Sequence, residues 1–246
     1  MTQRATSFGA ESGSYEKGRP EYPADAVAWL LEPLAKGTRA VVDIGAGTGK
    51  LTRAVLALGG TDVVAVDPDP QMLATLQENT PGVPVLEGTA EGLPLGDAVA
   101  DAAVLGQAWH WVDPVRASRE IGRVVRPGGV LGLIWNVRDD RVEWVRRLTA
   151  IMHGSAAEEM IAEDGVRVAD PFGVLERWRG EWSRPMTREQ LHAMARSRSY
   201  VITAAEEEKQ RIAREMDALF DDLGLAEGRT IDLPYVTAAF RAVRGS

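Results

Sequence analysis

Short apolar runs alternate with helical periodicity through the first two thirds of the chain. Five runs rich in β-branched residues have strand length and mostly lack polar alternation, at residues 40–44, 62–66, 83–86, 101–105 and 130–135. Such runs are typical of parallel strands that are covered on both faces. The stretches between them predict helices, so the pattern favours repeated strand–helix–strand units with right-handed crossovers.

Local signals mark where these helices begin and end. Asp69 and Asp113 each precede a proline. The carboxylate caps the first turn, and proline at the first helical position lacks an N–H that would have no partner there anyway. Glycine pairs at residues 59–60 and 128–129 are expected to end the preceding helices.

The last third of the chain breaks this rhythm. Residues 175–182 and 230–241 predict two further strands, which we expect to pair antiparallel. Thr187 and Thr203 stand three residues before Gln190 and Glu206, a capping-box spacing that predicts two helices inserted over about 187–224. Two roles stay open for this helical cap: a lid over a ligand, or a peripheral hairpin that extends the core.

These elements predict an α/β fold, Rossmann-like and doubly wound. Its mostly parallel seven-stranded sheet carries an antiparallel terminal strand pair and an inserted helical cap. We expect a single domain over residues 1–246. Its parts are an N-terminal segment with the first helix (1–38), a ligand-binding core (39–153), and the terminal strands with the helical insertion (154–246).

Composition and charge exclude several classes of site and of binding partner. The chain has 246 residues, 45% hydrophobic and 26% charged, and no cysteine, which excludes disulfides, thiolate zinc sites and cysteine nucleophiles. Its net charge of -8 disfavours broad nucleic-acid binding. No apolar run approaches the roughly 20 residues of a membrane span. We therefore expect a cytoplasmic monomer or homodimer with a small-molecule substrate, binding neither nucleic acid nor membrane.

A D-x-G-x-G-x-G motif at residues 43–49 follows the first apolar run and opens a helix. Glycines there let the backbone turn tightly and approach a ligand closely. A Walker A loop is excluded because Ile44 and Leu51 stand where its first glycine and its hydroxyl belong. Lys50 occupies the third glycine of a dinucleotide fingerprint, which disfavours pyrophosphate binding.

This spacing resembles motif I of the class I S-adenosylmethionine-dependent methyltransferases. That family places a ribose-binding acid at the end of the second strand, where Asp67 stands. A carboxylate at a strand end accepts hydrogen bonds from both ribose hydroxyls. Asp43 is predicted to steady the glycine turn through its backbone N–H groups, near the methionine part of the cofactor.

The resemblance continues after the third strand, where residues 88–95 look like the family's adenine-binding segment. Many relatives carry an aspartate where Thr89 stands, and a threonine accepts the adenine amino hydrogen only weakly. The adenine amino group then has two candidate acceptors, Glu91 and a backbone carbonyl. The backbone N–H of Ala90 is predicted to serve adenine N1. Residues 126–129 match the family's turn before the fifth strand, which is structural.

Residues 107–111 read Gln-Ala-Trp-His-Trp and resemble a subgroup similar to trans-aconitate methyltransferase. Ligands of doubly wound sheets lie beyond the carboxyl ends of the strands, so this run is expected to face the reactive end of the cofactor. Two roles stay open for His110, a general base and a structural hydrogen-bond donor. Trp109 is expected to line the cofactor pocket, and Trp111 to pack in the core.

The N-terminal segment also resembles that subgroup, through the spacing of Tyr15, Arg19, Pro20 and Tyr22. The resemblance implies that this segment covers the bound cofactor. Arg19 then pairs with the cofactor's carboxylate, and Tyr15 lies over its methionine end. Residues 20–23 are also consistent with a simple helix start.

No metal is expected. His153 and His192 make no ligand spacing with His110. The pair Asp139 and Asp140 is predicted to cap the following helix rather than to hold Mg²⁺.

The resemblance implies an enzyme that moves a methyl group from S-adenosylmethionine to a small molecule, with oxygen as the favoured acceptor atom. The alternatives are another S-adenosylmethionine-using reaction, such as cyclisation or aminopropyl-type transfer, a non-catalytic cofactor-binding protein, and a nicotinamide oxidoreductase. His110 is the expected catalytic residue. The expected cofactor-binding residues are Tyr15, Arg19, Asp43, Gly45, Ala46, Gly47, Gly49, Asp67, Pro68, Met72, Thr89, Ala90, Glu91, Gln107 and Trp109.

Overall fold

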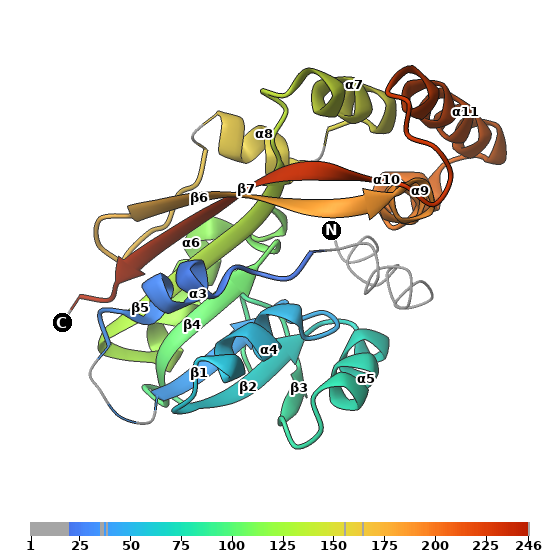
Figure 1. The fold of residues 1–246 in the computed structure, drawn as a ribbon. Helices are drawn as coiled ribbons and strands as arrows, with labels where there is room; N and C mark the ends of the chain where they lie inside the picture. The colour runs from blue at the N-terminus through green and yellow to red at the C-terminus, as the bar shows by residue number, and fades with distance from the viewer. Residues whose placement is uncertain (1–19, 35–36, 38, 155, 164, 246) are drawn as a thin grey trace.

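A computed structural model describes residues 20–34, 37, 39–154, 156–163 and 165–245. Within these ranges seven strands form one sheet in the order β3-β2-β1-β4-β5-β7-β6 (Figure 1). The strands from β3 to β5 run parallel, and β7 is antiparallel to both of its neighbours. The predicted fold class is confirmed, including the terminal antiparallel pair.

Three of the parallel strands match their predicted runs within a residue or two, but the fifth begins at Val125, directly after a helix that ends at Val124. Residues 128–129 lie inside that strand, so the prediction that they end the preceding helix is wrong. The strands are β1 (Arg39–Ile44), β2 (Thr61–Asp67), β3 (Val85–Glu87), β4 (Ala100–Gly106), β5 (Val125–Arg138), β6 (Glu176–Thr187) and β7 (Thr230–Val243). The helices are α3 (Ala24–Leu31), α4 (Lys50–Ala57), α5 (Pro70–Asn79), the 3-10 helix η2 (Trp109–Trp111), α6 (Pro114–Val124), α7 (Glu143–Met152), α8 (Ala156–Ala162), α9 (Arg188–Arg196), α10 (Ser199–Thr203) and α11 (Glu206–Asp222).

Alternate residues of the central strands supply two separate apolar layers. Val41 and Val63 pack with α3 and α4 on one face, whereas Val42 and Val66 pack with α6 on the other. All four side chains are buried. Because strand side chains alternate between faces, continuous apolar runs are required when helices cover both sides. Helices therefore cover both faces of the central strands.

The predicted helix caps are confirmed at Asp69 and Asp113. Asp69 Oδ1 accepts from Gln71 N at 2.9 Å, and Asp113 Oδ1 accepts from two first-turn N–H groups at 3.0 Å. These caps fix the start of α5 directly after β2 and of α6 directly after η2.

The helical insertion was predicted at the correct position, but its second N-cap and its number of helices were predicted wrongly. Thr187 and Gln190 form the predicted capping box of α9. Thr203 is not the N-cap of α11, because it is the last residue of α10 and α11 begins with Ala205 as its N-cap. A residue with helical backbone angles cannot be an N-cap, whose backbone is extended. The insertion between β6 and β7 therefore holds three helices among the described residues, not two.

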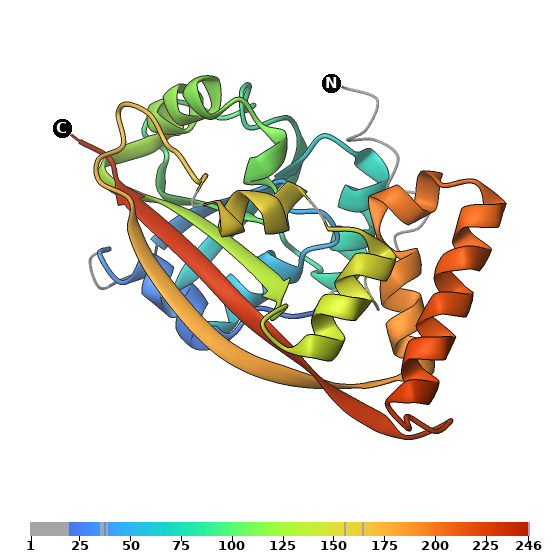
Figure 2. The ribbon, with the colours of Figure 1, turned by 90° about the horizontal axis from the view of Figure 1, so that it is seen from above.

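The cap helices have an apolar core of their own. Side chains of α7, α9 and α11 surround the ends of the long β6–β7 pair, with Met186, Phe220 and Leu233 buried among them. Figure 2 shows these helices gathered at the end of the strand pair that lies beyond the parallel sheet. Within the described ranges, no helix is long and apolar enough to cross a membrane.

Candidate active site

The glycine turn after β1 adopts backbone conformations that favour glycine. Gly45 has φ +67° and Gly47 has φ +54°. A Cβ on Gly45 would lie 2.8 Å from the Cβ of Ala108, whereas a Cβ on Gly47 would meet open space. The turn thus packs tightly against the loop after β4 at one glycine and leaves room for a ligand at the next.

Asp67, at the carboxyl end of β2, holds this turn in place. Its Oδ2 accepts from Gly47 N at 2.9 Å, and its Oδ1 accepts from Asp69 N at 2.9 Å. The side chain is 7% exposed. Burial raises the pKa of Asp67, while hydrogen bonds from Asp69 and Gly47 act in the opposite direction. The carboxylate is thus fixed at the strand end with acceptor positions left for a ligand.

Asp43 does not make the predicted contact with the glycine turn, and its part in cofactor binding stays a prediction. Its Oδ2 accepts from the hydroxyl of Thr52, in the first turn of α4, at 2.6 Å. Because strand residues alternate, Asp43 faces the same side as Val41, toward α4, rather than the strand-end turn. Asp67, not Asp43, steadies the glycine turn.

Asp43 makes a testable contribution to stability. Burial raises its pKa to about 7 from the ordinary 3.8, against the Thr52 hydrogen bond. A carboxyl with a raised folded-state pKa stabilises the fold fully at low pH, and this contribution is lost as pH rises through the folded value. Relative to Asp43→Asn, wild type should lose unfolding free energy between about pH 4 and pH 7, by up to about 1.4 kcal/mol per unit.

Urea unfolding across this pH range measures the difference. Asp62→Asn is the matched control, since Asp62 is an exposed aspartate at the start of β2. The control should follow the wild-type curve. Parallel curves for wild type and Asp43→Asn would contradict the buried, protonated carboxyl.

The segment after β3 lies beside this strand end. Thr89 and Gly92 pair through their backbones, and Ala90 is buried. Glu91 Oε1 accepts from Asp113 N at 2.9 Å, at the N-terminus of α6. That carboxylate therefore already anchors α6, and its part in adenine recognition stays a prediction. Met72 of α5 is buried, and Pro68 lies between β2 and α5.

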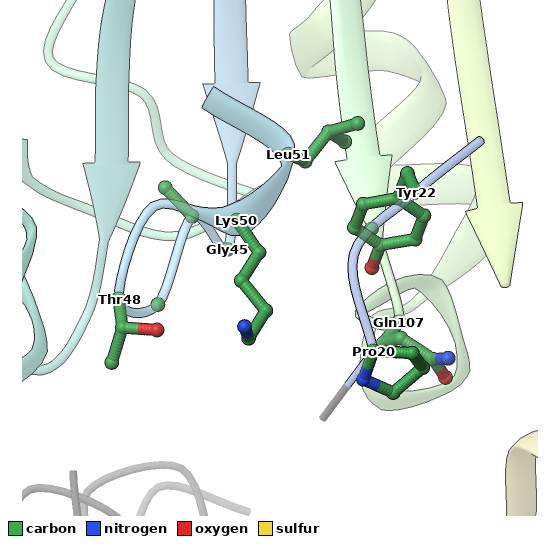
Figure 3. A pocket seen from close by; sticks show the side chains of 10 residues that line it. Pro20, Tyr22, Gly45, Thr48, Lys50, Leu51 and Gln107 are labelled. Atoms are coloured by element: carbon green, nitrogen blue, oxygen red, sulfur yellow. The ribbon is translucent and has the colours of Figure 1, made fainter. Parts of the chain in front are cut away.

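A cleft opens beyond the ends of β1 and β4. Figure 3 shows the glycine turn, Lys50 and Gln107 on its walls, with Pro20 and Tyr22 contributed by the chain before α3. Glu21 anchors that segment through two contacts. Its carboxylate lies 2.7 Å from Lys50 Nζ, and its backbone carbonyl accepts a hydrogen bond from Asn136 Nδ2 at 3.0 Å. Pro20 and Tyr22 therefore border the cleft, and the covering of a bound cofactor by this segment stays a prediction.

Tyr15 and Arg19 lie outside the described residues. Sequence reasoning missed Glu21 and Lys50 because their contact spans 29 positions. Sequence reasoning also missed that position 106 requires glycine, because a Cβ there would lie 2.6 Å from the Tyr22 hydroxyl. A glycine directly after an apolar strand was the available signal.

The Trp-His-Trp run forms η2, in which Trp109 is buried and Trp111 is exposed. Trp109 is 3% exposed and its Nε1 donates to Arg167 O at 2.9 Å. Trp111 is 50% exposed, so the expected core position is wrong. In a 3-10 turn, residues two apart lie on different sides of the helix, and Trp109 takes the inward side.

His110 contacts Trp135, a buried residue of β5. Trp135 Nε1 donates toward His110 Nδ1 at 3.4 Å. A neutral imidazole that accepts at Nδ1 carries its proton on Nε2. This contact favours His110 as a hydrogen-bond donor through Nε2, and the general-base role stays a prediction. Gln107 beside it donates from Nε2 to Asn136 O at 2.7 Å, which joins the ends of β4 and β5.

The acidic pair after β5 has a different role from the predicted one. Both oxygens of Asp139 are held by Arg141, at 2.7 and 2.6 Å. Helix α7 begins at Glu143 with Val142 as its N-cap, so neither aspartate caps it. Over the part of the chain that the structure describes, no group of three or more His, Cys, Asp or Glu side chains could hold a metal ion.

Comparisons with known proteins agree with this geometry. A family described as a methyltransferase domain matches residues 42–133. An uncharacterized methyltransferase of Mycobacterium tuberculosis (strain ATCC 25618 / H37Rv) is 46% identical over 237 residues, covering 96% of this chain and 95% of that protein. A malonyl-[acyl-carrier protein] O-methyltransferase of Pectobacterium atrosepticum is 35% identical over 129 residues, 52% of this chain and 50% of that protein.

A solved structure supports the fold. The protein assigned as a type II methyltransferase from Anaeromyxobacter dehalogenans aligns with a TM-score of 0.65 and 22% identity, over 92% of this chain and 97% of that one. The fold is a doubly wound α/β sheet, and its cleft lies at the ends of β1 and β4, where such sheets bind their ligands. The chain belongs to the class I S-adenosylmethionine-dependent methyltransferases. The more specific likeness to trans-aconitate methyltransferase stays a prediction.

The residues present fit the cofactor that this class uses. Open space at Gly47 lets the backbone approach a ligand, and Asp67 presents a buried carboxylate beside it. The cleft is bordered on its other side by Gln107 and the segment from Pro20.

Proposed function

We propose that this enzyme methylates a small-molecule acceptor, with oxygen as the favoured acceptor atom, and releases S-adenosylhomocysteine. The main observation is the joined arrangement of Asp67 and Gly47 at the edge of the cleft. The O-methyltransferase that aligns with 52% of this chain supports oxygen as the acceptor atom. We further propose that residues 1–246 act as a single domain.

The order of the strands supports an orientation for the cofactor. Asp67 ends β2 and would hold the ribose, and residues 89–91 follow β3 and would border the adenine. The glycine turn follows β1, beside the methionine part. The sheet order is β3-β2-β1-β4-β5. A cofactor that runs across the strand ends from adenine at β3 to methionine at β1 would therefore have its reactive end beside β4 and β5.

The bound cofactor supplies a methyl group on a sulfonium, which is already a strong electrophile. The protein then acts mainly by positioning the two reactants. In-line placement about 3 to 3.5 Å apart supplies a large share of the rate enhancement in many enzymes. Gln107 and His110 follow β4 and are the side chains proposed to orient the acceptor. The chain before α3 would exclude water from the cleft.

Ligand-dependent thermal unfolding tests the cofactor assignment. S-adenosylhomocysteine should raise the Tm of the full chain, because a ligand that binds only the folded state stabilises it by mass action. NAD should leave Tm unchanged. Stabilisation by NAD and not by S-adenosylhomocysteine would contradict the proposal and favour a nicotinamide oxidoreductase.

His110→Ala tests the role of the histidine. Loss of one hydrogen bond to a neutral acceptor costs about 0.5 to 1.5 kcal/mol, so kcat should fall by roughly three- to tenfold. A fall of about 10² to 10⁴ would instead indicate a general base. Initial rates at saturating S-adenosylmethionine distinguish the two.

His192→Ala is the matched control for this experiment. His192 lies on α9, where its Nε2 is 2.9 Å from Asp217 Oδ1. Its removal should leave kcat unchanged. Equal losses in both variants would mean that the effect is on folding rather than on the site.

A further inference from the structure

A second pocket adjoins the cofactor cleft. Pro20 lines both, and the hydrogen bond from Gln107 to Asn136 joins a wall of the first pocket to a wall of the second. The second pocket lies at the end of β5, under the cap, and is also lined by Arg138, Glu158 and Arg198. It therefore borders the strand ends where the reactive part of the cofactor is proposed to lie.

Two arginines meet one carboxylate in this pocket. Arg138, the last residue of β5, places Nη2 2.9 Å from Glu158 Oε1, and Arg198 places Nη2 3.2 Å from the same oxygen. The Arg138 side chain is 3% exposed. Among the described charged residues that line the pocket, two are basic and one is acidic.

Arg138 has a donor that the fold does not satisfy. Its Nε donates to Thr149 Oγ1 at 3.2 Å, but its buried Nη2 makes no well-directed hydrogen bond despite the short contact with Glu158. A buried guanidinium group costs free energy unless its N–H groups are paired. Arg198 also donates to His153 O at 3.1 Å, so the unsatisfied donor of the pair is the one on Arg138.

We propose that this pocket binds an oxyanion of the methyl acceptor, a carboxylate or a phosphate, through Arg138 and Arg198. The inference rests on the proposed function and names the chemistry of its substrate. A guanidinium fork matches the geometry of either oxyanion. Arg198 and Ser197 come from the cap, so a bound anion would also link the cap to β5.

Calorimetry on the full chain saturated with S-adenosylhomocysteine tests the inference. The probes are malonate, inorganic phosphate and neutral malonamide, at constant ionic strength. Malonate or phosphate should bind, and Arg138→Gln should weaken that binding at least about tenfold, while malonamide does not bind. Tighter binding of malonate than of phosphate identifies a carboxylate, and the reverse order identifies a phosphate.

Arg138→Lys and Arg141→Gln complete the design. The lysine variant keeps the charge without the fork and should bind the anion with intermediate affinity. Arg141 is 58% exposed and pairs with Asp139 and Glu181, so its variant should bind like wild type. Arg138→Gln should retain its affinity for S-adenosylhomocysteine, which shows that it is folded.

Three outcomes overturn the inference: neither anion binds, malonamide binds equally well, or Arg138→Gln retains full anion affinity. A purely structural Arg138 would lower Tm and leave anion affinity unchanged. Failure of wild type to bind S-adenosylhomocysteine is a different result, which counts against the proposed function itself.

Discussion

Asp67→Asn should weaken the affinity for S-adenosylhomocysteine by about a hundredfold. The substitution keeps the shape of the side chain and replaces one acceptor oxygen with a donor. Two hydrogen bonds to a charged group, at roughly 1.5 kcal/mol each, correspond to about that factor. The variant also disturbs the contact from Gly47 N, so that the glycine turn loses its anchor. Isothermal calorimetry measures the affinity.

Asp62→Asn controls for the removal of a negative charge from the same strand. Asp62 is exposed, and the strand end lies at Asp67. Its variant should bind S-adenosylhomocysteine like wild type. An affinity of Asp67→Asn within about threefold of wild type would show that ribose is held elsewhere.

Gly45→Ala is expected to reduce cofactor affinity by at least tenfold. At φ +67° an L-residue pays about 1 to 2 kcal/mol, and the new Cβ would lie 2.8 Å from the Cβ of Ala108. The turn must shift to relieve this contact, which moves the backbone that borders the cleft. Calorimetry with S-adenosylhomocysteine and the change in Tm together measure the effect.

Gly59→Ala separates backbone strain from damage to the site. Gly59 has φ +72° and open space around its missing side chain, between α4 and β2. It should lower stability by about 1 kcal/mol and leave cofactor affinity unchanged. If both glycine variants bind S-adenosylhomocysteine like wild type, the glycine turn does not border the cofactor.

The parallel core was predictable because each of its signals is local. Apolar runs follow from burial on both faces, and Asp69 and Asp113 cap helices through atoms two or three residues away. The glycine spacing identified the ligand-binding turn for the same reason. The bounds of β1, β2 and β4 differ from the predicted runs by a residue or two at each end.

The remaining features depend on which segments meet in space. The orientation of Asp43 toward Thr52 required the packing of α4 on β1. The exposure of Trp111 and the burial of Trp109 required the geometry of η2. Arg138 and Arg198 are 60 residues apart and share Glu158 only because the cap folds over the end of β5. No periodicity or spacing in one sequence signals such contacts.

Methyl transfer from isotopically labelled S-adenosylmethionine tests the central claim most directly. The full chain is incubated with the labelled cofactor and a bacterial small-molecule extract, and the products are separated by mass. We predict S-adenosylhomocysteine in equal amount to a small molecule that has gained one labelled methyl group, and Asp67→Asn should abolish both. Consumption of the cofactor without a labelled acceptor would contradict the account and favour cyclisation or aminopropyl-type transfer, and no consumption at all would favour a cofactor-binding protein without turnover.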